Sequence, residues 1–181
     1  MSMMNREDTL AVFIDFQEKL MPAMSNKEVL EDKVVRLAEG LKVLDIPHIV
    51  TQQYTKGIGE TIPSIAEAIG EFEAIDKTCF GCMGNVEFVN QVELAEKKNI
   101  IVCGIEAHIC VQQTVEQLIE EGYRVYVPVD CLSSRSQNDF LWATERMERA
   151  GAILTTYESV LYELLVDSKA PEFKAISAIV K

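Results

Sequence analysis

Short apolar runs alternate along this chain with longer segments of helical periodicity. The runs rich in β-branched residues lie at 10–14, 48–51, 72–76, 100–103, 125–129 and 152–155. Between the first two, Leu30, Val34, Leu37, Leu41 and Leu44 recur at spacings typical of one face of an amphipathic helix. Strands buried on both faces and separated by helices pair mostly in parallel. The alternation therefore predicts an α/β fold with three layers, a parallel sheet covered by helices on both faces.

Composition and net charge exclude several classes of protein and of binding partner. The chain has 181 residues, 48% of them hydrophobic, which fits one globular domain spanning 1–181. Its 17 basic and 29 acidic residues give a net charge of −12, which disfavours nucleic acid and anionic membrane surfaces as partners. No apolar run approaches the roughly 20 residues of a membrane span. We expect no signal peptide, and the five cysteines favour a reducing, cytoplasmic setting over a disulfide framework.

Three polar residues follow predicted strands at their carboxyl ends. Asp15 comes directly after the first run, Lys77 follows the short third run, and Cys110 lies shortly after the run at 100–103. Ligand sites of open parallel sheets lie at this edge. From position alone, Asp15 could equally be a turn aspartate and Lys77 a surface lysine.

Cys110 begins the helix that follows the run at 100–103. The positive end of a helix dipole favours a thiolate, and the free backbone N–H groups of a first turn can bind an oxyanion. These properties predict a nucleophilic thiol. A buried structural cysteine is the alternative that the sequence leaves open.

Other reactive residues point less clearly to chemistry. Cys79 and Cys82 form a C-x-x-C pair, but it lies in the middle of the chain, in a loop that contains glycine, and no second close pair completes a zinc site. His48 begins a strand, and His108 lies too near Cys110 in sequence to serve easily as its base. The serines of 133–137 are placed to cap a helix or to hold an anion.

Three segments taken in order resemble the motifs of the isochorismatase-like cysteine hydrolases. They are Val12-Phe13-Ile14-Asp15-Phe16-Gln17, Asp76-Lys77-Thr78-Cys79-Phe80 and the run from Gly104 to Thr114 that contains Cys110. The resemblance extends over nearly the whole chain. The segments 52–59, 133–137 and 151–156 are most similar to the isochorismatase-domain-containing branch of that superfamily.

The resemblance implies a Rossmann-like fold with a six-stranded parallel sheet and a catalytic triad. By analogy Cys110 is the nucleophile, Asp15 takes its proton, and Lys77 keeps Asp15 ionised. The oxyanion would lie on the backbone N–H groups of Glu106 and Cys110, with a cis peptide bond between Ile105 and Glu106. The residues assigned to the substrate pocket are Gln17, Tyr54, Phe80 and His108.

Two departures from the family pattern refine the expected activity. Metal-dependent nicotinamidases of this family carry an aspartate and histidines after the second strand, where this chain reads Thr51-Gln52-Gln53-Tyr54-Thr55-Lys56. Isochorismatases proper tend to lack the cysteine that stands here as Cys110. We therefore expect hydrolysis of an amide-type C–N bond, with no metal and no cofactor.

The sequence thus predicts a cytoplasmic cysteine hydrolase of a small amide, ureido or imide-like metabolite. A catalytically idle homologue that binds a metabolite or a protein is the alternative, and a thiol redox protein is a third. The resemblance also implies a homo-oligomer, a dimer or a tetramer. An apolar stripe near the end of the chain could pack against a partner or within the same chain; it consists of Phe173, Ile176, Ile179 and Val180.

Overall fold

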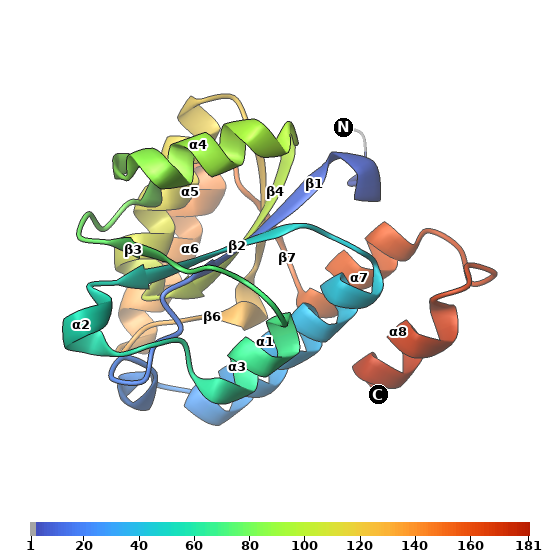
Figure 1. Ribbon diagram of the computed structural model, residues 1–181, viewed down its shortest axis with the longest axis horizontal. Coiled ribbons are helices and arrows are strands. Elements are labelled where there is room, and N and C mark those ends of the chain that lie inside the picture. Colours follow the sequence, from blue (N-terminus) through green and yellow to red (C-terminus); the bar gives the residue numbers. More distant parts are fainter. Residues whose placement is uncertain (1–2) are drawn as a thin grey trace.

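A parallel sheet forms the centre of the computed structural model, which describes residues 3–181 (Figure 1). Its strands are β1 Thr9–Ile14, β2 His48–Gln53, β3 Ile75–Lys77, β4 Asn99–Ile105, β5 Arg124–Pro128, β6 Leu132–Ser133 and β7 Ile153–Thr155. Six of them follow the order β3-β2-β1-β4-β5-β7, and every pairing is parallel. Met1 and Ser2, which the expected 1–181 domain includes, lie outside the described residues.

Helices cover both faces of the sheet, as expected (Figure 1). One layer holds α1 Lys27–Val43, α3 Pro63–Ile69, α7 Tyr157–Leu165 and α8 Phe173–Val180. The other holds α4 Val86–Ala95, α5 Gln112–Glu120 and α6 Gln137–Ala150, while the short α2 Thr55–Ile58 follows the carboxyl end of β2. Within residues 3–181, no helix combines the length and the apolar character needed to cross a bilayer.

β1 separates two hydrophobic cores, one on each face of the sheet. Ala11 and Phe13 pack into the core on the α1 side, whereas Leu10, Val12 and Ile14 pack into the core on the α5 side. All five side chains are almost completely buried. The near-continuous apolar run at 10–14 is therefore the pattern of a strand with helices on both of its faces.

The sheet has seven strands, where six were expected. β5 pairs with the first half of β4, at Asn99–Ile101, and ends at Pro128. The carboxyl end of β4 is paired instead by β6, which sets Leu132 and Ser133 against Gly104 and Ile105. A strand of two residues is too short to produce a periodic signal in the sequence. The third strand also lies at 75–77, later than the expected 72–76.

The order of strands fixes where a ligand site can form. From β1 the chain moves outward to β2 and β3, then returns to the opposite side of β1 to form β4 and continues outward to β5 and β7. The connections that leave β1 and β4 therefore diverge at their carboxyl ends and open a crevice there. Asp15 and the segment that carries Cys110 follow these two strands directly.

The apolar stripe of α8 packs within the chain. Ile176 is fully buried, and Phe173, Ile179 and Val180 lie against the core formed by α1 and α7. Because the stripe packs within the chain, it no longer supports the expectation of a homo-oligomer.

Candidate active site

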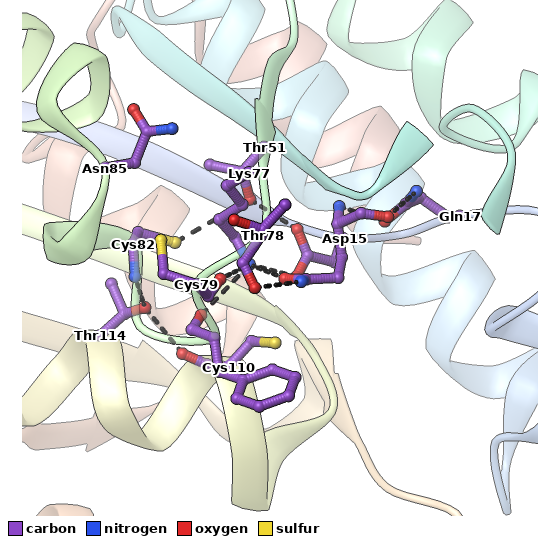
Figure 2. Close-up of polar contacts among 12 residues, drawn as sticks. Asp15, Gln17, Thr51, Lys77, Thr78, Cys79, Cys82, Asn85, Cys110 and Thr114 are labelled. Carbon is purple, nitrogen blue, oxygen red and sulfur yellow. Dashed lines mark hydrogen bonds and ion pairs between the residues drawn. The ribbon is translucent and has the colours of Figure 1, made fainter. Parts of the chain in front are cut away.

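Asp15, Lys77 and Cys110 meet at the carboxyl edge of the sheet (Figure 2). Asp15 follows β1, Lys77 is the last residue of β3, and Cys110 lies in a π-helical segment, Ala107–Val111, that joins β4 to α5. Although 95 positions in the sequence separate Asp15 from Cys110, the fold brings the carboxylate close enough to the thiol to raise the pKa of Cys110.

The Lys77–Asp15 ion pair is completely buried. Lys77 Nζ donates to Asp15 Oδ2 at 2.8 Å, and neither side chain has any exposed surface. The ammonium also has Gln53 Oε1 at 2.7 Å, Phe80 O at 3.1 Å and Cys79 O at 3.2 Å. Four oxygens thus surround a group with three N–H donors. Burial lowers the pKa of Lys77, but the Asp15 carboxylate and, to a smaller extent, Cys82 and Cys110 together outweigh burial, and the pKa is raised overall. Lys77 is therefore a fixed cation.

Asp15 is held in a single orientation. Its backbone has a φ of 56°, in the left-handed region, where non-glycine residues are uncommon. Its N–H donates to Thr51 O at 3.1 Å, and Thr51 Oγ1 donates to its Oδ1 at 2.8 Å. With Lys77 on Oδ2, both carboxylate oxygens have a donor, and the remaining lone pairs are available to the Cys110 thiol.

Cys110 is a protonated thiol in this setting. Its side chain is almost completely buried, at 6% exposure, and burial raises its pKa. The negative charge of Asp15 raises it further, while Lys77 opposes both effects. The expectation that the start of a helix favours a thiolate is therefore wrong for the free protein, because burial and the Asp15 charge raise the pKa of the thiol. Nucleophilic attack needs a base to remove the thiol proton.

Thr114 fixes the backbone of the Cys110 segment. Its Oγ1 donates to Cys110 O at 2.7 Å and accepts the Cys82 N–H at 2.9 Å. Thr114 is fully buried on α5, one turn after Cys110. The hydroxyl therefore ties the cysteine-bearing segment to the loop that follows β3 (Figure 2).

The chain between β4 and Cys110 has unusual geometry. The peptide bond between Ile105 and Glu106 is cis, the geometry that the resemblance implies. Gly104 pairs with Ile14 of β1, and a Cβ at this glycine would lie 2.6 Å from Ile14 O. A side chain would thus push the two strands apart. The Glu106 carboxylate accepts from both the backbone N–H and the Nε of Arg135 at 3.0–3.1 Å, which anchors this segment to the loop after β6.

The four residues assigned to the substrate pocket have different environments. Gln17 is fully buried, and its amide donates to Gln53 O and Gly59 O and accepts the Gln53 N–H. With these three hydrogen bonds, Gln17 holds the backbone of Gln53 and Gly59 in place. Tyr54 and Phe80 are about half exposed, at 52% and 55%. The fourth residue, His108, has its Nδ1 2.9 Å from Ser134 Oγ, and this contact directs the ring toward the loop after β6.

The C-x-x-C pair does not have the properties of a redox centre. Both thiols are free, and Cys82 is fully buried. Burial raises the pKa of Cys82 to about 12, whereas redox-active cysteines have lowered pKa values. Within residues 3–181, no group of three or more His, Cys, Asp or Glu side chains is arranged to hold a metal ion.

Sequence reasoning missed three residues that surround the triad. They are Thr51, Gln53 and Thr114, which contact Asp15, Lys77 and the backbone of Cys110. In the sequence, Thr51 and Gln53 stand out only as part of the stretch where metal-dependent relatives carry an aspartate and histidines. A usable signal was present, since alternate residues at the carboxyl end of a strand beside Asp15 must face the same crevice. Ser136 does cap α6, as one reading of 133–137 predicts.

Comparison with known proteins identifies the family. The family described as Isochorismatase domain matches residues 9–159. "Isochorismatase domain-containing protein 2" of Danio rerio is 34% identical over 177 residues, covering 97% of this chain and 88% of that protein. "Isochorismatase domain-containing protein 2A" of Mus musculus is 35% identical over 179 residues, covering 97% and 84%.

Solved structures agree with this assignment. The MAR1 ribonuclease from Caenorhabditis elegans is 37% identical, with a TM-score of 0.92 over 99% of this chain and 92% of that one. YcaC from Pseudomonas aeruginosa, solved with hexane-2,5-diol and covalent acrylamide, is 25% identical, with a TM-score of 0.93 over 98% and 90%. The matched domain covers most of the chain, and the chain therefore belongs to the isochorismatase family, in its isochorismatase-domain-containing branch.

Proposed function

We propose that this protein is a cysteine hydrolase that cleaves an amide-type C–N bond in a small amide, ureido or imide-like molecule. The observation that carries the proposal is the buried Lys77–Asp15 pair, joined at 2.8 Å, with the Cys110 thiol near enough that both charges act on its pKa. Membership of a family with a hydrolase fold supports the reaction class. An ionised base next to a protonated thiol supports nucleophilic catalysis.

The first half of the reaction forms a thioester. Asp15 accepts the proton of Cys110, and the sulfur attacks the carbonyl carbon of the substrate. Asp15 then passes the proton to the leaving nitrogen, the C–N bond breaks, and ammonia or an amine departs. Lys77 offsets the negative charge that moves between carboxylate and sulfur, so that the buried cluster keeps one positive and one negative charge throughout.

The second half releases the acid. Water attacks the thioester carbon while Asp15 takes one of its protons. The C–S bond breaks, the acid leaves, and the proton returns to the Cys110 sulfur. The oxyanion of both tetrahedral intermediates would accept hydrogen bonds from the backbone N–H groups of Glu106 and Cys110. Thr114 and Arg135 support this task, because each fixes one end of the segment that carries these N–H groups.

The substrate side of the site is assigned to Tyr54, Phe80 and His108. Tyr54 and Phe80 both lie next to Lys77. The Tyr54 N–H donates to Lys77 O, and Phe80 O accepts from Lys77 Nζ. Gln17 acts indirectly, by holding the backbone of Gln53. Because little of Cys110 is exposed, the group that reaches its sulfur must be small.

The charge that this mechanism needs comes from Lys77, so the proposal includes no metal and no cofactor. We also propose that the protein works in the cytoplasm, where its free cysteines stay reduced, and that it forms a homo-oligomer. Exposed Leu141 and Trp142 on α6 are the candidate contact residues. A monomer at micromolar concentration, measured by light scattering, would contradict the proposed homo-oligomer.

A panel of small amides, ureido compounds and imides tests the activity directly. We expect ammonia release, or ring opening of an imide by mass spectrometry, and a Cys110 acyl adduct trapped during turnover. RNA belongs in the same panel, since the Caenorhabditis elegans relative is called a ribonuclease. Cleavage of RNA with no amide hydrolysis would overturn the proposal, as would the absence of turnover throughout a broad panel, which would favour an idle binding homologue.

Asp15→Asn should abolish turnover, because an amide cannot take the thiol proton. General base catalysis provides about 10²- to 10⁴-fold, and we expect a loss in kcat of that size. Asp76→Asn is the matched control, since Asp76 precedes Lys77 but is exposed on the opposite side of the strand. Asp15→Asn with a kcat near that of the wild type would contradict the assignment of the base.

Lys77→Met should be inactive and much less stable. Removing one partner of a buried ion pair costs about 3–5 kcal/mol, because the other charge is left uncompensated. The double variant Asp15→Asn/Lys77→Met should recover part of this loss in urea unfolding, since no buried charge remains. Lys98→Met, at an exposed lysine, should stay within about 0.5 kcal/mol of the wild type. Equal destabilisation in the single and double variants would show that lost packing, and not charge, sets the cost.

Alkylation of Cys110 should accelerate steeply with pH. A raised pKa means that the thiolate is a minor species at neutral pH, and its fraction grows about tenfold per pH unit while the pH stays below that pKa. We expect the iodoacetamide rate at Cys110, followed by peptide mapping, to climb from pH 7 to pH 9. Lys77→Met should slow labelling at every pH, because the cation lowers the thiol pKa. A rate that is flat over this range would indicate a stable thiolate.

A further inference from the structure

Thr51 contacts Asp15 at two points. Its carbonyl accepts the Asp15 N–H at 3.1 Å, and its hydroxyl donates to Asp15 Oδ1 at 2.8 Å. Thr51 is fully buried near the end of β2, in register with Ile14, the last residue of β1. The hydroxyl therefore lies where no water competes for it, against the carboxylate oxygen that Lys77 does not occupy.

A thiol that the proposed reaction does not use lies on the other side of this hydroxyl. Cys82 Sγ donates to Thr51 Oγ1 at 3.9 Å, in the range of a weak sulfur hydrogen bond (Figure 2). Cys82 is fully buried, and the N–H of its backbone is held by Thr114. The thiol keeps its proton and points it at the Thr51 oxygen. The Thr51 hydrogen is thereby directed to Asp15.

The two oxygens of Asp15 differ in what they can do with a proton. The ammonium of Lys77 can only donate, so a proton on Oδ2 would face a donor. Oδ1 is therefore the oxygen whose hydrogen-bond partner can adapt when Asp15 takes up the proton of Cys110. A hydroxyl can both donate and accept, and it suits Oδ1 whether that oxygen is ionised or protonated. When the Thr51 hydroxyl accepts a hydrogen bond from protonated Oδ1, the hydroxyl's own hydrogen can turn toward the sulfur of Cys82, which is a weak acceptor.

We propose that Thr51 is a positioning residue whose hydroxyl holds the Asp15 carboxyl in both of its protonation states, with the Cys82 thiol as its second partner. The proposal rests on the function proposed above, in which Asp15 carries the proton. In this proposal, β2 orients the base Asp15 directly, through Thr51. It also gives a reason for a buried thiol beside the triad.

Thr51→Val and Thr51→Ser test the proposal with an amide substrate from the panel. Valine keeps the shape and removes the hydroxyl, and we expect kcat to fall about 10- to 100-fold, the factor that a hydrogen bond to a charged group provides. KM should change by less than about threefold, and Thr51→Ser should restore kcat to within about threefold of the wild type. Thr144→Val is the matched control, because among residues 3–181 that buried hydroxyl bonds only to carbonyls of its own helix.

A second measurement needs no substrate. The S–H stretching band of Cys82, assigned by its disappearance in Cys82→Ala, should move to higher frequency in Thr51→Val as the sulfur loses its acceptor. An unmoved band, an unchanged kcat in Thr51→Val, or equal losses in the valine and serine variants would each overturn the role of the hydroxyl. Activity in Asp15→Asn would instead overturn the proposed function, so the two failures are distinguishable.

Discussion

The buried ion pair between Lys77 and Asp15 is the interaction on which the rest of this site depends. Removing an ammonium and a carboxylate from water costs several kcal/mol per ion in a protein, and the pair persists only if further hydrogen bonds replace the lost solvation. Lys77 donates those bonds to Gln53 Oε1 and to the carbonyls of Cys79 and Phe80. The loop after β3 is thus folded around the cation. The same contacts that stabilise the pair bring this loop, and Cys82 within it, against the other strands.

The ion pair also determines the state of the thiol. A lysine alone beside Cys110 would favour a thiolate, but Asp15 cancels that effect, and burial then keeps the sulfur protonated. The cluster therefore has no net charge at rest. In the proposed reaction, such a site keeps the Cys110 sulfur unreactive until one proton moves to Asp15.

The sequence predicts those parts of this structure that depend on local pattern. Strands buried on both faces, the helix at 27–43 and the cap at Ser136 all follow from spacing and residue type, and the positions of Asp15 and Lys77 follow from the ends of strands. Residues that act through register are not visible in the same way. Thr51 reaches Asp15 because β2 is aligned so that Thr51 faces Ile14, and no local pattern encodes that alignment. The raised pKa of Cys110 depends on burial by distant segments and was predicted with the wrong sign.

Gly104 connects the fold to the site through the approach of two strands. Its missing side chain lets β4 run against Ile14 at the last residues of β1, and this contact sets the separation between the turn at Asp15 and the segment leading to Cys110. A thiol proton can pass to a carboxylate only when the two groups are in hydrogen-bonding range. A wider separation of β1 and β4 would leave both residues in place on their own strands and still break the transfer. The close packing at this glycine is therefore a condition of the proposed chemistry, although the glycine contributes no reactive group.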